Sequence, residues 1–244
     1  MKAVIFSGTT EGRTLSRAVA ALGADVTVCV ATDLGAEEQG RAPGITVRAG
    51  RLDAGEMTAL LQGAALCVDA THPYATEATR NIRAAATAAG VAYHRLLRPA
   101  SDLPAGSVVL ETAAQAAAYL AAKPGNVLLA TGAKELPAFA ALDPARLYPR
   151  VLPTLAGITA CETAGIPHRN IIAMQGPFTL ELNVALLRQF AIAAMVTKDG
   201  GAAGGFAEKA EAAARCGVQL IVLRRPEEQG ENAETILQRC RELL

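Results

Sequence analysis

The sequence has no excess of either charge and no long apolar run. It contains 23 lysines and arginines against 23 aspartates and glutamates in 244 residues, so its charge favours neither nucleic acid nor an anionic membrane as a partner. The first apolar run ends at Gly8, which is too short for a signal-peptide core, and no later run approaches the length of a membrane span. These absences predict a cytoplasmic protein in which local arginines meet any anionic ligand.

Cysteine is present in an odd number and without metal-site spacing. The five cysteines include no C-x-x-C pair, and several lie inside apolar strand or helix patterns. We therefore expect reduced core thiols and predict neither disulfides nor a metal site. A chain of this length, 51% hydrophobic, can bury a sufficient core without such links.

Short β-rich runs alternate with alanine-rich amphipathic stretches along the whole chain. Runs that are apolar on both faces indicate strands of parallel sheets covered by helices. The predicted strands lie near residues 3–6, 25–32, 44–50, 65–71, 92–97, 126–132, 146–153, 170–176, 191–200 and 218–226. The predicted helices lie near residues 11–23, 53–63, 75–90, 112–122, 155–165, 179–190, 205–217 and 231–244.

One segment, "RPASDLPAGS" at residues 98–107, interrupts this alternation with prolines and small polar residues. It is the best candidate for a linker. The sequence thus predicts an α/β protein with two Rossmann-like, doubly wound lobes, residues 1–98 and residues 99–244. Ligands are expected in a cleft at the carboxyl ends of the strands.

The turn after the first strand, "SGTTEGR", lacks the G-x-G-x-x-G spacing of common dinucleotide sites. Gly8 still permits a tight turn, and Gly12 lets the next helix lie close to the sheet. Backbone N–H groups and the hydroxyls of Thr9 and Thr10 are placed to meet a phosphate. The alternative is an ordinary strand-to-helix turn with an N-cap threonine.

The second strand ends without the acidic residue that NAD-selective enzymes carry for the ribose hydroxyls. Asp33 falls one or two places late, whereas Arg13 and Arg51 are candidates to meet a 2′-phosphate. This pattern favours NADPH over NADH, with solvated surface arginines as the alternative.

The loop "DATHPYA", residues 69–75, follows another apolar strand. Pro73 restrains His72 to an extended conformation, which places an imidazole beside the phenol of Tyr74 and the hydroxyl of Thr71. A single histidine is more often structural than catalytic, but so many polar groups are unusual in a connector.

Cations and glycines mark the strand ends of the second lobe. "ATGAKEL" carries Lys134, "YPRVLPT" carries Arg150, "MQGPFT" carries Gln175, and "TKDGGAAGG" carries Lys198 beside glycines. Flexible backbone next to a lysine suits close approach of a bulky anion; the competing interpretation of the last segment is a glycine-rich surface loop.

Taken together, the ordered motifs "GTTEGR", "DATHPYA", "LLRP", "ATGAKEL", "RVLPT", "AMQGPF" and "TKDGG" resemble the precorrin-6A reductase family of cobalamin biosynthesis, over nearly the whole chain. The resemblance implies two Rossmann-like lobes, a nicotinamide cofactor at the amino-terminal lobe, and reduction of one double bond of a tetrapyrrole macrocycle. One departure is Gly200, where the family commonly has serine, so a hydroxyl contact to substrate or cofactor is either lost there or replaced by water or backbone.

The resemblance also implies roles for individual residues. The proton donor stays open among His72, Tyr74, Lys198 and bound water. The expected cofactor-binding residues are Gly8, Thr9, Thr10, Glu11, Gly12, Arg13, Thr32, Arg51 and Thr71, with His72 and Tyr74 beside the nicotinamide. The expected substrate-binding residues are Arg98, Lys134, Arg150, Gln175, Lys198, Asp199 and Gly201.

Two other classes of function compete with this interpretation. One is a regulatory module that senses NAD(P)H, which would not need the cations of the second lobe. The other is a reductase or epimerase of a small substrate, which would carry a Y-x-x-x-K pair that this sequence lacks. The motifs fit a metal-free or a cobalt-bearing ring, NADH as well as NADPH, and any oligomeric state.

Overall fold

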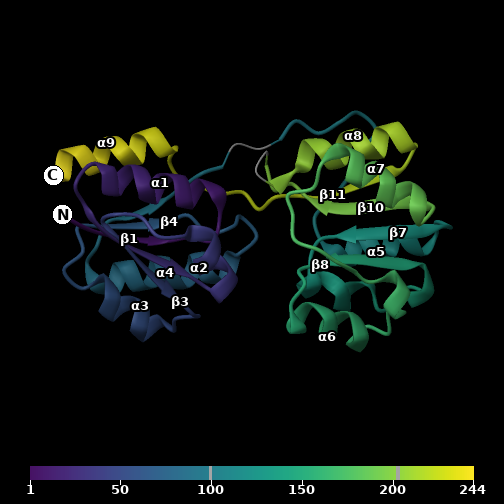
Figure 1. Cartoon of the computed structure of the whole chain (residues 1–244), viewed down its shortest axis with the longest axis horizontal. Coiled ribbons are helices and arrows are strands. Elements are labelled where there is room, and N and C mark those ends of the chain that lie inside the picture. Colours follow the sequence, from purple (N-terminus) through teal and green to yellow (C-terminus); the bar gives the residue numbers. More distant parts are fainter. Residues whose placement is uncertain (99–100, 202–203) are drawn as a thin grey trace. The chain divides into compact units, whose positions relative to one another are not determined.

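The computed structural model describes residues 1–98, 101–201 and 204–244. Within them the chain forms two compact units (Figure 1). The first lobe contains residues 1–98 and 226–244, and the second lobe contains residues 101–225. Each lobe is a parallel sheet covered by helices on both faces, which confirms the predicted fold class.

The first lobe has a five-stranded sheet in the order β3-β2-β1-β4-β5, with every neighbouring pair parallel. Residues alternate between its two faces: Ile5 packs beneath α1 and α9, whereas Val4 and Phe6 pack against α3 and α4. The elements are β1 (Lys2–Phe6), α1 (Thr10–Ala21), β2 (Asp25–Val30), α2 (Asp33–Gln39), β3 (Ile45–Ala49), α3 (Ala54–Leu61), β4 (Leu66–Asp69), α4 (Thr76–Ala89), β5 (Tyr93–Arg95) and α9 (Ala233–Leu243).

The second lobe has a six-stranded parallel sheet in the order β6-β11-β10-β7-β8-β9. Helices α5 and α6 and the 3₁₀ helix η1 pack on one face, and α7 and α8 pack on the other. The elements are β6 (Val108–Leu110), α5 (Ala113–Ala121), β7 (Asn126–Ala130), η1 (Ala133–Phe139), η2 (Pro144–Arg146), β8 (Leu147–Val151), α6 (Leu155–Thr163), η3 (His168–Asn170), β9 (Ile172–Ala173), α7 (Leu180–Gln189), β10 (Ile192–Lys198), α8 (Phe206–Cys216) and β11 (Gln219–Leu223).

The predicted domain boundary is wrong at the carboxyl end of the chain. We expected all of residues 99–244 in the second lobe, but residues 226–244 return to the first. Ile236 and Cys240 of α9 are fully buried there, in the same core as Leu15 and Val19 of α1. The apolar face of α9 shows that the helix needs a partner surface, but the local pattern does not specify which sheet supplies it.

Each sheet has one point at which the chain reverses the direction of strand addition. In the first lobe this point lies between β1 and β4, and in the second it lies between β7 and β10. Ligands of open α/β sheets bind at the carboxyl ends of strands beside such a point. The four loops found there carry the motifs "GTTEGR", "DATHPYA", "ATGAKEL" and "TKDGG".

Every predicted strand and helix is present, and the sequence missed α2, β6 and the three short 3₁₀ helices of the second lobe. Helix α2 is only seven residues long, "DLGAEEQ", and shows no repeated apolar face. Strand β6 has three residues directly after the predicted linker. In the described parts of the chain no helix has the length and apolarity to cross a membrane, and no group of three or more His, Cys, Asp or Glu is placed to hold a metal ion.

Candidate functional site

The turn after β1 is joined to the loop after β4 by one hydroxyl. Thr9 is the N-cap of α1, and its Oγ1 accepts the N–H of Gly12 at 3.0 Å and donates to the carbonyl of Ala70 at 2.9 Å. The backbone N–H of Arg13 is the first to bond inside the helix. The N–H groups of Thr10 and Glu11 precede it and are available to an anion at the positive end of the helix dipole.

The two glycines of this turn meet different surroundings. A Cβ at Gly12 would lie 2.4 Å from Ser7 Oγ and 2.9 Å from Ala70 Cβ, so only glycine lets α1 approach the sheet this closely. A Cβ at Gly8 would meet nothing within 4 Å, and its φ of +117° suits glycine. Gly8 therefore makes the turn and leaves open space above it.

This turn fits the phosphates of a dinucleotide. Ser7 Oγ is buried and has no hydrogen-bond partner among the described residues, and an unpartnered buried hydroxyl costs free energy until a ligand pairs with it. Beside it the helix N-terminus offers N–H donors, which is the usual anion site of this fold. A small hollow borders the turn and is lined by Gly8, Thr9, Thr10, Arg13, Gly35, Glu38 and Gln39.

Three other residues predicted to hold the cofactor, Arg13, Thr32 and Arg51, lie at different distances from this turn. Arg13 borders the hollow and donates from Nη1 to the carbonyl of Glu38 at 2.8 Å. Thr32 is the N-cap of α2, where its Oγ1 accepts the N–H of Gly35. Arg51 is exposed just after β3, two strands away from β1.

Arg98, which the sequence analysis lists among the expected substrate-binding residues, lies in the first lobe. Its guanidinium pairs with the carboxylate of Glu11 in the first turn of α1, and its side chain is largely buried. The pair places a cation next to the predicted phosphate site and restrains Glu11, so Arg98 belongs to the surroundings of the first turn.

The "DATHPYA" loop presents two rings from a short, internally bonded turn. The N–H of Tyr74 donates to Nδ1 of His72 at 3.3 Å, and the two ring centroids are 5.5 Å apart. Pro73 between them is buried, while His72 and Tyr74 are half-buried. Thr71 points inward and donates its hydroxyl to Asp69 Oδ1 at 2.6 Å.

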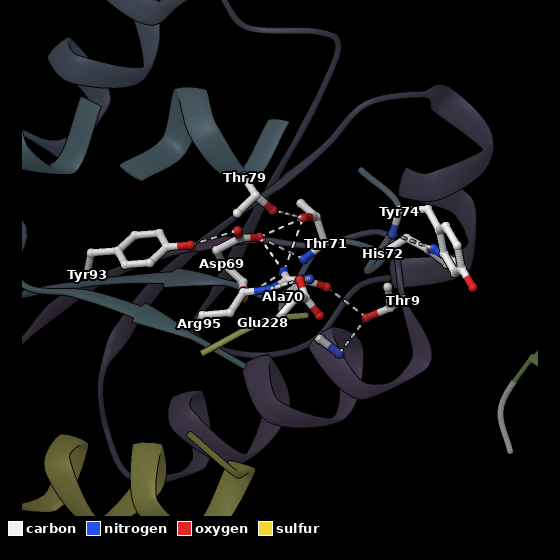
Figure 2. A network of polar contacts seen from close by, with 11 residues as sticks. Thr9, Asp69, Ala70, Thr71, His72, Tyr74, Thr79, Tyr93, Arg95 and Glu228 are labelled. Carbon is white, nitrogen blue, oxygen red and sulfur yellow. Dashed lines mark hydrogen bonds and ion pairs between the residues drawn. The ribbon is translucent and has the colours of Figure 1, made fainter. Parts of the chain in front are cut away.

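Beneath this loop lies a buried charge network that the sequence did not reveal (Figure 2). Arg95 Nη1 is 2.8 Å from Asp69 Oδ1, and Arg95 Nη2 is 2.6 Å from Glu228 Oε1. The Tyr93 hydroxyl donates to Asp69 Oδ2 at 3.0 Å, and burial together with Asp69 raises the pKa of that phenol. The network ties the loop after β4 to β5 and to the returning carboxyl-terminal segment. Its only sequence signal was an aspartate at the end of an apolar strand.

In the second lobe an ion pair joins the two loops at the switch point. Lys198 Nζ, at the end of β10, is 2.6 Å from Glu135 Oε1 in η1. Asp199 accepts hydrogen bonds from the N–H and hydroxyl of Ser101 and from the N–H of Gly201. Burial opposes ionisation of Asp199, but these hydrogen bonds hold the pKa of its carboxyl below the usual value. Asp199 thus shapes its own loop.

The remaining predicted cations differ in burial. Arg150 is buried on β8, where its guanidinium lies 4.1 Å from the ring centroid of Phe178 and donates to Asn183 Oδ1 at 2.8 Å. Lys134, near the start of η1, and Gln175, in the loop after β9, are exposed. Lys209 of α8 is buried near Arg150, and the sequence missed it because it lies in an ordinary amphipathic helix.

Two doubly wound parallel lobes, the first with a turn built for dinucleotide phosphates, define the class of nucleotide-binding α/β proteins. The family model described as "Precorrin-6x reductase CbiJ/CobK" matches residues 2–241. The chain therefore belongs to the precorrin-6x reductase family, which confirms the resemblance found in the motifs.

Individual relatives agree with the family model along most of the chain. The chain is 37% identical over 230 residues to the cobalt-precorrin-6A reductase of Priestia megaterium, covering 91% of this chain and 90% of that protein. It is 34% identical over 237 residues to the cobalt-precorrin-6A reductase of Methanothermobacter thermautotrophicus, covering 93% and 77%. The solved structure titled "CobK precorrin-6A reductase" superimposes with a TM-score of 0.80 at 25% identity, covering 99% of this chain and 97% of that one.

Membership of this family makes the protein an oxidoreductase that uses a nicotinamide cofactor. It supports the main interpretation of the sequence and gives no support to a sensor module or to a reductase of a small substrate.

Proposed function

We propose that the protein transfers a hydride from NADPH to a precorrin-6A-type macrocycle and reduces one ring double bond, giving a precorrin-6B-type product in cobalamin biosynthesis. The observation that carries this proposal is the family match over residues 2–241. The relatives named as cobalt-precorrin-6A and precorrin-6A reductases support the same substrate class.

When bound, the nicotinamide supplies the hydride; the chain binds and orients the partners. The N–H groups of Thr10 and Glu11 and the hydroxyl of Ser7 bind the pyrophosphate. Gly12 lets the helix come close enough for these contacts, because any side chain there would collide with Ser7. Thr9 holds the phosphate turn next to the loop after β4, because its hydroxyl donates a hydrogen bond to the carbonyl of Ala70.

The loop after β4 lies at the same switch point, so Thr71, His72 and Tyr74 are proposed to border the nicotinamide. The Asp69–Arg95–Glu228 network underneath gives this loop a rigid base. A proton must also reach the carbon next to the reduced one. His72, Tyr74, Lys198 and bound water remain the candidates for that donor.

Selectivity for NADPH is proposed from the end of β2 and from Arg13. No acidic residue ends β2, and Asp33 begins α2 as an exposed residue. Arg13 lies on the border of the hollow next to Gly8 and Gly35, where a guanidinium is suited to hold a phosphate by two parallel hydrogen bonds. Arg51 and Thr32 are proposed for the adenosine end of the cofactor.

The second lobe is proposed to bind the acetate and propionate carboxylates on the edge of the macrocycle. Several separate cations and donors suit such a ligand better than one deep polar pocket does. The proposed residues of the second lobe are Lys134, Arg150, Gln175, Lys198, Asp199 and Gly201. Arg98 of the first lobe, which pairs with Glu11, is proposed to bind the substrate as well.

The direct test follows the loss of NADPH absorbance after adding metal-free or cobalt-bearing precorrin-6A, with NADH in parallel. Turnover with one of the macrocycles and preference for NADPH are expected. Arg13→Ala should weaken the binding of NADPH about ten- to a hundredfold and leave the binding of NADH unchanged, since a charge-assisted hydrogen bond contributes about 1.5–3 kcal/mol. Arg17→Ala is the matched control, because Arg17 is on the same helix and also bonds a backbone carbonyl of α2. Absence of turnover with both macrocycles would exclude the proposed reaction.

A further inference from the structure

The segment at residues 226–231, through which the chain returns to the first lobe, lies directly against β5. The N–H of Glu231 donates to the carbonyl of Arg95 at 2.9 Å, and the N–H of Leu97 donates to the carbonyl of Glu231 at 2.8 Å. A Cβ at Gly230 would collide with the Arg95 carbonyl oxygen and lie 2.9 Å from the Arg95 Cβ. Only glycine therefore lets the segment come this close to Arg95.

The same segment brings the carboxylate of Glu228 to the guanidinium of Arg95 (Figure 2). Glu228 Oε1 accepts from Arg95 Nε at 2.9 Å and from Nη2 at 2.6 Å. The third nitrogen, Nη1, donates to Asp69 Oδ1 at 2.8 Å and to the carbonyl of Asp69 at 3.2 Å. Each nitrogen of the planar guanidinium thus has an oxygen partner, so two carboxylates together fix its orientation.

Asp69 in turn fixes the first residues of the loop after β4. Its Oδ1 accepts the N–H of Thr71 at 3.0 Å and the Thr71 hydroxyl at 2.6 Å. Arg95 Nη1 also donates to Thr71 Oγ1 at 3.2 Å, and His72 follows directly in the chain. A continuous series of hydrogen bonds therefore runs from Glu228 through Arg95 and Asp69 to the start of the loop.

Loss of the charge on Glu228 would disturb this series at its far end. Arg95 is 3% exposed, and a buried guanidinium that loses one of its carboxylates moves towards another acceptor, because unpaired N–H groups are costly to leave buried. Asp69 and Thr71 share hydrogen bonds with Arg95 and would move with it. A displacement of about 1 Å at a reacting centre is enough to slow a reaction about a hundredfold.

We propose that Glu228 is a positioning residue for hydride transfer, which acts through Arg95 and Asp69 on the loop that carries Thr71 and His72. This inference rests on the proposed function and adds a residue from the far end of the sequence that no motif marked. Glu228 supports the loop from beneath and is not among the residues proposed to bind either ligand. Its removal should therefore lower kcat and leave both affinities nearly unchanged.

The first arm compares Glu228→Gln with Glu227→Gln in the full-length enzyme. Glu227 is the adjacent carboxylate and is exposed, so it is the matched control. In Glu228→Gln alone, kcat should fall about ten- to a hundredfold, while the KM for precorrin-6A and the Kd of NADPH should stay within about twofold. Glu228→Asp keeps the charge on a shorter side chain, and its kcat should lie between those of Glu228→Gln and the wild type.

A kinetic isotope effect separates a positioning role from a merely structural one. With NADPH deuterated at the transferred hydrogen, Glu228→Gln should show a large isotope effect on kcat, because hydride transfer is then the slowest step. Unchanged kcat, a loss confined to the Kd of NADPH, or a loss of kcat without an isotope effect would overturn the proposal. If Glu228→Gln does not fold, Glu228→Asp is used for the same measurements.

The second arm needs no turnover. The chain has three histidines, so the ring signal of His72 is followed by NMR in histidine-labelled full-length protein and assigned by its absence from His72→Gln. Glu228→Gln should shift or broaden this signal, and Glu227→Gln should leave it unchanged. His168, which is exposed in the second lobe, is the internal reference. An unchanged His72 signal in Glu228→Gln would show that the loop does not depend on Glu228 and would overturn the proposal.

These arms also separate this inference from the proposed function. If the wild-type protein fails to reduce precorrin-6A while the His72 signal still responds to Glu228→Gln, the reaction is wrong and the support of the loop by Glu228 stands. If the wild type turns over and Glu228→Gln changes neither kcat nor the His72 signal, the reaction stands and the positioning role is wrong.

Discussion

At the first switch point, each of four residues in the turn after β1 has a different structural role. Gly12 permits close packing and Gly8 permits the backbone conformation. Ser7 keeps a buried hydroxyl that has no partner among the described residues, and Thr9 bonds to the neighbouring loop. Of these, Gly8 alone combines a positive φ with open space above it. A side chain at Gly8 would therefore occupy the space proposed for phosphate.

Gly8→Val is expected to abolish NADPH binding while the protein stays folded. Its control is Gly63→Val, because Gly63 also has a positive φ of 70° and nothing within 4 Å of a Cβ. Both variants should lose a similar free energy of unfolding, about 1–3 kcal/mol for the strained backbone, and only Gly8→Val should lose the cofactor. Calorimetric titration and thermal unfolding measure the two effects. Normal NADPH affinity in Gly8→Val would remove the first lobe from the proposed cofactor site.

Lys198→Ala tests the proposed division between the lobes. The substitution removes a cation and leaves Glu135, which is partly exposed, without its partner. We expect the KM for the macrocycle to rise about tenfold, with the Kd of NADPH nearly unchanged. Equal losses of both affinities would contradict the assignment of Lys198 to the substrate.

Lys209 also predicts how stability depends on pH. Its pKa is about 8 in the folded protein, against 10.5 for an ordinary lysine. Between these values the unfolded chain binds the extra proton, so the free energy of unfolding should rise with pH across this window, by about 3 kcal/mol in total. Lys209→Met should lack this rise. Denaturant unfolding at pH 7 and pH 10 in both proteins isolates the effect, since all other groups are common to them; parallel pH dependences would contradict it.

At the scale of secondary structure, the local pattern predicts helix α9 correctly but does not identify the surface against which the helix packs. The sequence predicts the helix and its apolar face. The structure packs Ile236 and Cys240 into the core of the first lobe, and Figure 1 shows α9 beside α1 on one face of that sheet. The last helix is therefore part of the lobe that carries the proposed cofactor site.

Ile236→Ala should destabilise the first lobe. Ile236 is fully buried, so removing its side chain should lower the free energy of unfolding by about 2–5 kcal/mol. Leu243→Ala is the control within the same helix, because Leu243 is 49% exposed. NADPH should raise the melting temperature of both proteins if the first lobe binds the cofactor. Equal stability of the two variants would contradict the packing of α9.

The accuracy of the sequence-based elements follows from their local signals. Strands β1, β4 and β10 are continuous apolar runs followed by polar turns, so they and their loops were predicted together. Helix α2 was missed because its seven residues show no apolar repeat. Arg95 and Lys209 were missed because nothing in their neighbours distinguishes a buried cation from a solvated one.

At the scale of the whole chain, the first lobe is discontinuous. Its sheet comes from residues 1–98, but α9 and the segment with Glu228 come from the far end of the sequence. The backbone of Glu231 bonds to Arg95 and Leu97 on both sides of a parallel bridge at Leu96. The second lobe is thus inserted into the first.

A fragment of residues 1–98 should therefore fail to form a stable lobe. It lacks the helix that covers Leu15 and Val19, and Arg95 loses its partner Glu228. Joining residues 226–244 to it through a short glycine-serine linker should restore a cooperative melting transition and NADPH binding. Circular dichroism and calorimetric titration provide the measurements. Equal stability of the two fragments would show that α9 is not needed.

The alternation of strands and helices, the parallel sheets and the family all follow from the amino-acid sequence, because each depends on local periodicity or on motifs read in order. Tertiary structure alone decided which lobe receives α9, that Arg98 pairs with Glu11, and that Arg95 and Lys209 are buried among charges. The physical reason is that packing partners and electrostatic neighbours come from residues distant along the chain, and no local pattern encodes them.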